Sequence, residues 1–190
     1  MLWRTKSKEH RKKLRQRLRT MESYGMRAVS EPKYHCRPIN SGGTDTLSFI
    51  DLAKEMRDEC APHLPFDPNC IASNCVAVYE DKRRDRRQAW LLFKDDVAIG
   101  YLVAHATEYY FCTALSTSTE VMFVTKSERN WKAFKCIMDT YQEWALSIDA
   151  VQMFTGVARV DAEIAEKMQK IFPRLGFNWC GSYFVKEIGR

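Results

Sequence analysis

The fold is decided by the stretch Glu120-Val-Met-Phe-Val-Thr-Lys-Ser-Glu-Arg-Asn-Trp-Lys-Ala-Phe-Lys135. After its leading carboxylate, the segment 120–124 is apolar and rich in strand-forming residues. Lys126-Ser127-Glu128 interrupts this run, and Ser127 is expected to cap the next helix. The apolar residues that follow recur at helical spacing: Trp131, Phe134, Met138, Tyr141 and Ala145. The stretch therefore predicts a strand, a turn and a helix, and the free N–H groups at such a helix start suit a phosphate.

Length and composition limit the class of protein. The chain has 190 residues, of which 45% are hydrophobic, enough for one domain with a real core and an appendage. No apolar run approaches the roughly 20 residues of a membrane span. The basic N-terminus lacks the apolar segment of a secretory signal. We therefore expect no membrane association and a cytoplasmic protein.

The cysteines and histidines do not form a recognisable metal motif. There are seven cysteines, with no Cys-x-x-Cys pair, and four scattered histidines. We expect reduced, mostly buried thiols and no metal site.

Positive charge is concentrated at the N-terminus. Residues 1–38 carry 12 lysines and arginines against 3 acids, a net charge of +9, whereas the remaining residues carry 18 against 21, a net charge of −3. Residues 1–33 are expected to form a basic helical arm and a linker, with a globular domain over 34–190. Through residues 1–30 the arm could bind nucleic acid or an acidic protein, or it could be a solvated helix; basic charge alone does not separate these alternatives.

The rest of the chain alternates strand and helix signals. Strands are expected at 34–39, 88–94, 97–110, 120–124, 151–158 and 183–188, and helices at 46–60, 70–80, 131–149 and 161–172, with a loop at 113–119. In the first of these helices the residues expected to face inward are Leu47, Ile50, Leu52, Ala53 and Met56. This order predicts an α/β (α+β) fold with a mixed central sheet flanked by helices.

Four pieces of the sequence carry a resemblance to a known family. They are Cys36-Arg-Pro-Ile39, Val97-Ala-Ile-Gly-Tyr-Leu-Val103, the stretch from Glu120 to Lys135, and Arg174-Leu-Gly-Phe177. Their order over residues 34–190 resembles the GNAT superfamily of acyl-CoA-dependent N-acyltransferases. The similarity is closest to the divergent GNAT-like proteins of tailed phages, which implies a protein of the host cytoplasm or of the virion.

The resemblance implies a site for acetyl-CoA and transfer of its acetyl group to a primary amine of unknown identity. A backbone amide near Phe123 or Val124 would polarise the thioester carbonyl. The pyrophosphate would lie on the amides from Arg129 to Ala133, including those of Asn130 and Lys132. Charge-assisted contacts to the phosphates would come from Lys126, Arg129 and Lys132.

The sequence departs from the family pattern in places that bear on catalysis. Lys132 and Phe134 stand where the family's phosphate loop has glycine and a small residue. Phe172 stands where a tyrosine often protonates the departing thiolate. These departures favour an alternative hypothesis, a structural or interaction protein such as a virion component that keeps the fold without its chemistry.

Transfer to an amine needs a base, and Glu120 is the best candidate because it precedes the proposed carbonyl site on the same strand. Alternation along the strand places it on the face of Met122 and Val124. An ordinary strand-end carboxylate is the alternative. His105 is a further candidate, although a hydrogen-bonded core histidine is the simpler interpretation.

Overall fold

The computed structural model describes residues 32–40, 42–80, 86–156 and 162–181. The predicted basic arm, its binding residues 1–30 and the predicted last strand at 183–188 lie outside this part of the chain. The elements in order are β1 (Tyr34–Pro38), α2 (Gly43–Cys60), α3 (Pro68–Glu80), β2 (Arg87–Lys94), β3 (Val97–Glu108), β4 (Leu115–Val124), the 3-10 helix η1 (Lys126–Glu128), α4 (Trp131–Ser147), β5 (Gln152–Phe154), α5 (Ala162–Ile171) and the 3-10 helix η2 (Phe172–Leu175).

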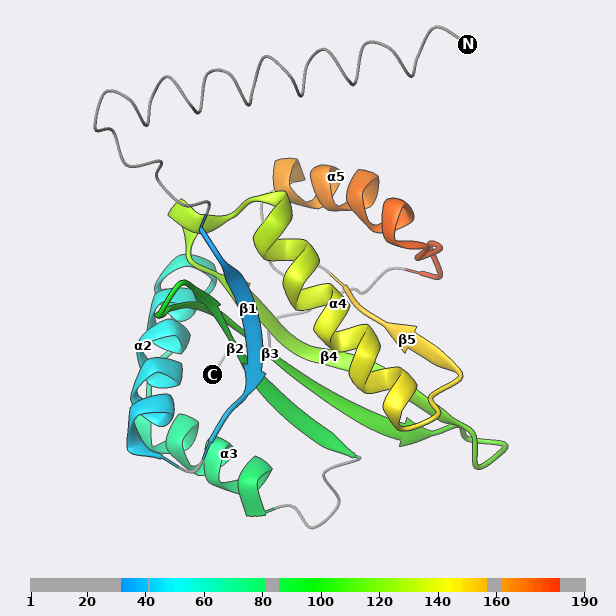
Figure 1. Cartoon of the computed structure of the whole chain (residues 1–190), viewed down its shortest axis with the longest axis horizontal. Coiled ribbons are helices and arrows are strands. Elements are labelled where there is room, and N and C mark those ends of the chain that lie inside the picture. The colour runs from blue at the N-terminus through cyan, green and yellow to red at the C-terminus, as the bar shows by residue number, and fades with distance from the viewer. Residues whose placement is uncertain (1–31, 41, 81–85, 157–161, 182–190) are drawn as a thin grey trace, which may run out of the picture. The chain divides into compact units, whose positions relative to one another are not determined.

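The described strands form one mixed sheet in the order β1-β2-β3-β4-β5 (Figure 1). The first four strands pair antiparallel, and β5 pairs parallel to β4. A mixed sheet flanked by helices was the fold class predicted from the sequence, and it is confirmed. Among the described residues, no helix is both long and apolar enough to cross a bilayer.

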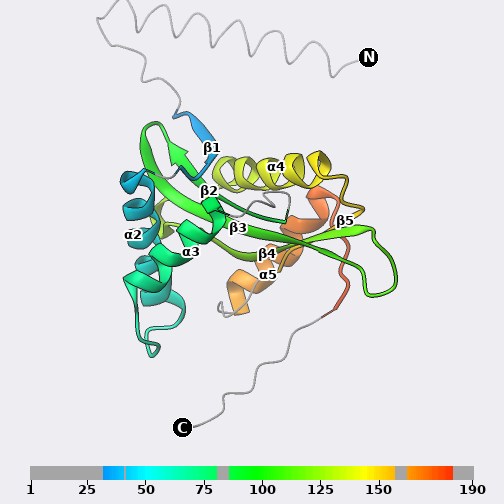
Figure 2. The same cartoon turned by 90° about the horizontal axis from the view of Figure 1, so that it is seen from below.

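Each face of the sheet is covered by helices. Helices α2 and α3 lie on one face and α4 on the other, as Figure 2 shows edge-on. The strand alternation divides the core accordingly. The buried residues on the α2–α3 side include Phe49, Leu52, Leu91, Tyr101 and Phe123. Those on the α4 side include Leu92, Leu102, Ile137, Tyr141 and Trp144.

One predicted inward position in α2 is wrong. Leu47 is 64% exposed, whereas Phe49, two residues later, is buried and packs its ring on Tyr101. In α4 the helical spacing began at Trp131, which is the first residue of the helix and is 45% exposed. Helical spacing identifies a face but does not decide where the face begins.

The predicted loop at 113–119 is largely strand, since β4 begins at Leu115. Ser and Thr are compatible with an extended chain, and β3 supplies a full row of partners down to Glu108. Thr117 is completely buried, and its hydroxyl is 2.9 Å from the hydroxyl of Tyr141. Burial raises the pKa of Tyr141 to about 12, so this phenol stays protonated and able to donate.

Strand β5 is shorter than the predicted strand at 151–158. It covers only Gln152–Phe154, and residues 157–161 lie outside the described part.

The backbones of β3 and β4 approach closely at Gly100. A Cβ atom there would lie 2.5 Å from the carbonyl oxygen of Phe123 and 3.2 Å from the Cα atom of Val124. Gly100 also follows an irregularity in the β2–β3 register, in which Ile99 has no counterpart on β2. The glycine therefore lets β3 bend while keeping its pairing with β4.

We expect Gly100→Ala to lower the free energy of unfolding by about 1–3 kcal/mol, because the methyl group meets backbone that cannot move aside. Urea denaturation measures this change. Gly43→Ala is the control: no atom lies within 4 Å of its added methyl group, and Gly43 is helical, so this variant should be neutral or more stable. Equal losses of unfolding free energy in the two variants would contradict the close backbone approach at Gly100.

The start of α2 is held to β1 by a buried carboxylate. Both oxygens of Asp45 accept from Arg37, at 2.6 and 2.7 Å, and Oδ2 also accepts from the backbone N–H of Asn40 at 2.8 Å. The Arg37 guanidinium is the main reason that the pKa of Asp45 lies below its usual range.

Because its folded-state pKa is depressed, Asp45 stabilises the fold above its unfolded pKa of about 4, and this contribution is lost as pH falls below that value. We expect Asp45→Asn to cost about 2 kcal/mol at pH 7 and to flatten the loss of stability between neutral and acid pH. Denaturation curves at several pH values measure both effects. Asp51→Asn is the control, because Asp51 is exposed on the same helix, and it should leave the curves unchanged. An unaltered pH profile in Asp45→Asn would refute the stabilising role of the Asp45 carboxylate.

Candidate functional site

Strand β4 separates from β5 part-way along its length. The two strands pair only at Ser116–Ser118, opposite Gln152–Phe154. One residue later, the hydroxyls of Thr119 and Thr155 are 3.2 Å apart. The remaining segment of β4, 119–124, has no described strand on its β5 side. An edge of this kind can receive an extended ligand through backbone hydrogen bonds.

A β-bulge lies where this separation begins. Val121 pairs with Val103 and Thr119 pairs with Ala104, so Glu120 is an extra residue in β4. Its Oε2 accepts from Arg87 Nη2 at 2.7 Å, and its Oε1 lies 3.5 Å from His105 Nδ1. The bulge thus presents a carboxylate held by β2 and β3, and bulges often redirect side chains beside functional sites.

The bulge overturns the predicted facing of Glu120. Met122 and Val124 pack in the α4-side core, whereas Glu120 and Val121 both line a cavity on the α2–α3 side. Strict alternation would have placed the carboxylate with Met122 and Val124. The inserted residue lets two consecutive side chains share one face. His105, the other candidate, is not a closed core residue, because 37% of its side chain is exposed beside Glu120.

Arg129 links the turn after β4 to the end of that strand and to α2. The Arg129 side chain donates from Nε to the carbonyl of Val124 at 2.8 Å, and both of its Nη atoms donate to the carboxylate of Glu59 at 2.7 Å. The hydrogen bonds to Glu59 are the main reason that the pKa of Arg129 is raised. Two predicted site residues, Arg129 and Val124, are therefore brought together, with the guanidinium 5.5 Å from the ring of a third, Phe123.

The helix cap is Asn130 and not Ser127. Ser127 lies within η1, and that short helix has no side-chain cap. Asn130 adopts an extended backbone, and its Oδ1 accepts from the N–H groups of Lys132 and Ala133 at 2.9 and 3.1 Å. Its Nδ2 donates to Tyr34 Oη at 3.0 Å, which ties the helix start to β1.

The cap bears directly on the predicted phosphate site. Asn130, Lys132 and Ala133 come together at the helix start as predicted, but two of the proposed N–H donors already serve the Asn130 side chain. A phosphate on these amides would have to take the place of that side chain. Whether residues 123–133 bind a cofactor stays a prediction.

Phe134 and Phe172, the two aromatic residues that depart from the family pattern, contact each other. The rings of Phe134 and Phe172 are 5.9 Å apart in an edge-on arrangement, and Phe177 is 5.7 Å from Phe172. Trp131 lies 6.2 Å from Phe134 on the same helix. This cluster joins the first turns of α4 to the segment after α5, so side-chain bulk fills that junction.

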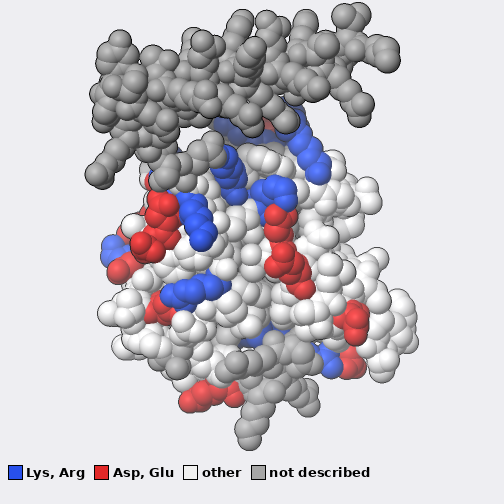
Figure 3. Space-filling view, viewed as in Figure 1, with Lys and Arg blue, Asp and Glu red and all other residues white. Residues whose placement is uncertain are grey.

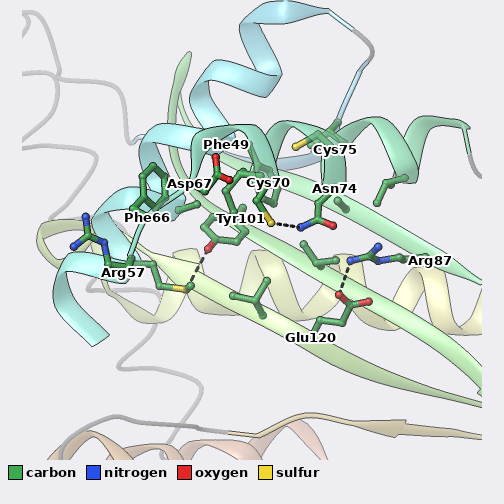
Figure 4. A pocket seen from close by; sticks show the side chains of 18 of the residues that line it. Phe49, Arg57, Phe66, Asp67, Cys70, Asn74, Cys75, Arg87, Tyr101 and Glu120 are labelled. Carbon is green, nitrogen blue, oxygen red and sulfur yellow. Dashed lines mark hydrogen bonds and ion pairs between the residues drawn. The ribbon is translucent and has the colours of Figure 1, made fainter. Parts of the chain in front are cut away.

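A cavity of about 370 Å³ lies between α2–α3 and the sheet (Figure 4). Its walls come from α2, the α2–α3 loop, α3 and strands β2–β4. Most lining residues are apolar; those with a charge or an amide are Arg57, Asp67, Asn74, Arg87 and Glu120. The hydroxyl of Tyr101 donates to Met56 Sδ at 3.1 Å, and burial raises the pKa of this phenol.

Sequence reasoning missed two parts of this cavity. Arg87 reads as the end of the charge run 81–87, yet it belongs to β2 and carries the ion pair to Glu120. Its spacing from Ala89 and Leu91, two inward residues of the same strand, was the available signal. The sequence around the loop residues Phe66 and Asp67 gave no indication that they line a cavity.

Charges on the outer surface are mixed in sign. On the face shown in Figure 3, lysines and arginines lie next to aspartates and glutamates. Ion pairs between described residues include Lys94–Glu128 at 2.8 Å and Lys135–Asp139 at 2.5 Å. Within the described ranges, no group of three or more His, Cys, Asp or Glu is arranged to hold a metal ion.

We expect Asn130→Ala to lower the free energy of unfolding by about 1 kcal/mol, because two helix-start N–H groups lose their acceptor. Ser127→Ala is the matched control and should change it little, since Ser127 caps no helix. Thermal or urea denaturation of both variants measures the difference. A larger loss in Ser127→Ala would restore the serine as the cap.

The sequence matches no protein-family model, and comparison with curated proteins gave no match. Solved structures of the same architecture do match. An aminoglycoside N-acetyltransferase in complex with CoA aligns with a TM-score of 0.65 and 16% identity, over 85% of this chain and 99% of its own. A GNAT family acetyltransferase from Staphylococcus aureus aligns with a TM-score of 0.59 and 14% identity, over 82% and 98%.

A transcriptional regulator from Bacillus halodurans C-125 aligns equally well, with a TM-score of 0.65 and 11% identity, over 82% of this chain and all of that one. Likeness at such identities establishes the architecture and leaves the activity to be argued from the site. The protein described here has the fold of the GNAT acetyltransferases.

Proposed function

We propose that the protein is an N-acetyltransferase that moves an acetyl group from acetyl-CoA to a primary amine. One observation carries this proposal. Glu120 lies on β4 next to the point where pairing with β5 ends, and it also lines the cavity on the α2–α3 side. A carboxylate in this position lies between the edge that suits the cofactor and the cavity that suits the acceptor.

Acetyl-CoA would bind along the edge of β4 that has no described strand on its β5 side, and its phosphates would displace the Asn130 side chain from the helix start. When bound, acetyl-CoA supplies the activated acetyl thioester. The backbone of Phe123 or Val124 would donate to the thioester carbonyl. The phosphates would take the helix-start amides of Lys132 and Ala133, with positive charge from Lys126 and Arg129 nearby.

The chain's own residues would perform the proton transfer. Glu120 would accept a proton from the acceptor's ammonium group, directly or through one water, which leaves a neutral nitrogen able to take the acetyl group. Transfer would form the C–N bond and break the C–S bond of the thioester, and the departing CoA thiolate would take up the second proton that the nitrogen loses. Arg87 and His105 hold the carboxylate in place from β2 and β3. No covalent bond to the protein is needed.

A second candidate is a binding protein that keeps the fold without catalysis. The contact between Phe134 and Phe172 favours it, because these two side chains occupy positions where the family has a small residue and a proton donor. In this hypothesis residues 1–30 bind nucleic acid or an acidic protein, for example in a phage particle. Equal co-purification with that partner after deletion of residues 1–30 would rule out the arm as the binding element.

Calorimetric titration with acetyl-CoA separates the two candidates. The enzyme hypothesis predicts a dissociation constant within the range of about 1 µM to 1 mM that is common for enzyme substrates. Absence of binding at the upper end of that range would exclude it and leave the binding-protein hypothesis.

We expect Glu120→Gln to lower kcat/KM for a primary amine by about 100-fold or more, because the base is lost, while acetyl-CoA affinity is unchanged. Mass spectrometry of the acetylated amine measures turnover. Glu108→Gln is a close control: Glu108 also pairs with a β2-side arginine, Arg86, at 2.9 Å, but it does not line the cavity. Similar losses in both variants would remove Glu120 as the base.

A further inference from the structure

The inside of the cavity is apolar. Its floor is formed by Ala89, Tyr101 and Val103 of the sheet, and the rings of Phe49 and Phe66 enclose it from α2 and the α2–α3 loop (Figure 4). Its volume of about 370 Å³ is near the lower end of the range of about 300–1,000 Å³ typical of small-molecule sites. The space therefore suits one small organic molecule with a body that prefers to leave water.

A carboxylate and a guanidinium lie together at one end of this space. Glu120 and Arg87 form their ion pair beside Val121, away from Phe66 and Arg57 in Figure 4. Arg87 contacts Oε2 of the carboxylate. Oε1 lies 3.5 Å from His105 Nδ1 and, with two lone pairs, can also accept a hydrogen bond from an incoming ammonium. A ligand complementary to the whole cavity has a cationic group at Glu120 and an apolar part that lies toward Phe49 and Tyr101.

The same lining disfavours a polar polyamine. An amino sugar carries several ammonium and hydroxyl groups spread over its rings, and each group loses hydration on entering the cavity. Only five of the twenty lining residues carry a charge or an amide, and only Asp67 and Glu120 among them are carboxylates, too few to pair with several ammonium groups. Buried polar groups without partners are unfavourable, so such a ligand would bind poorly.

We propose that this cavity is the acceptor site and that the acceptor is a small primary amine on an apolar body, not an amino sugar. The proposal rests on the acetyltransferase function proposed above and adds the substrate class. It also distinguishes this chain from its aminoglycoside-modifying structural neighbour, with which it shares the fold.

Binding of a series of straight-chain amines, from propylamine to octylamine, tests the proposal on the full chain without acetyl-CoA. Each methylene that enters the cavity should lower the Kd about fourfold until the space is filled. NMR titration measures each Kd, and the aromatic resonances of Phe49 and Phe66 should shift with the longer amines. Kanamycin, a polycationic amino sugar, should bind more weakly than hexylamine.

Two variants test separately how the ammonium group and the apolar chain of the ligand contribute to binding. Glu120→Gln should raise the Kd of hexylamine about tenfold and leave that of hexanol unchanged, because only the amine carries a charge. Ala53→Leu should fill part of the cavity and weaken octylamine more than propylamine. Leu47→Ala, on the exposed side of α2, is the control and should change neither Kd. The series on the unmodified protein stands on its own if Ala53→Leu does not fold.

The outcomes distinguish this inference from the proposed function. If amines bind more tightly as their chains lengthen but no acetyl group is transferred, the cavity is an amine-binding site and the acetyltransferase function is refuted. Acetyl transfer to kanamycin in preference to hexylamine upholds the enzyme and overturns the assignment. A Kd independent of chain length, or no binding of any amine, overturns the assignment as well.

Discussion

The extra residue in β4 is the constraint on which the arrangement of the site depends. Opposite Val103 and Ala104, the strand accommodates Glu120 without a partner, and this changes which side chains face which helices. Without the bulge, alternation would place the carboxylate with Met122 and Val124 in the apolar core under α4, where an unpaired charge is costly. With the bulge, the apolar residues stay in their cores and the carboxylate meets Arg87 and His105 at the edge of the cavity.

The turn after β4 shows how stability and ligand binding compete for the same atoms. A helix start exposes N–H groups that either a side chain or an anion can satisfy. Here Asn130 serves two of them and also bonds to Tyr34, while Arg129 bridges Val124 and Glu59. The turn is therefore held by side-chain hydrogen bonds that need no ligand. The affinity of any phosphate that binds there is reduced by the loss of the cap.

The fold is shared by acetyltransferases and by a protein described as a regulator, so the architecture alone does not select a function. What distinguishes this chain lies in its side chains. The aromatic pair Phe134–Phe172 closes one junction on the α4 side, and the apolar cavity opens on the α2–α3 side next to Glu120. The chemistry proposed here uses the second of these features.

The sequence alone determined the order of the described elements up to α5, the mixed sheet and the strand-turn-helix from Glu120 to Lys135, because these depend on local propensity and on hydrophobic spacing. It also placed Glu120 and residues 123–133 as candidates. Only the tertiary structure decided the start of β4 at Leu115 and the side of the sheet that Glu120 faces. Both depend on partners distant in sequence, the pairing with β3 and the guanidinium of Arg87. The Asn130 cap is local, since its acceptor oxygen serves Lys132 and Ala133, and the contact with Tyr34 adds a distant partner to it. A one-residue change of register leaves the hydrophobic pattern almost unaltered, yet it moves a side chain to the opposite face of the sheet.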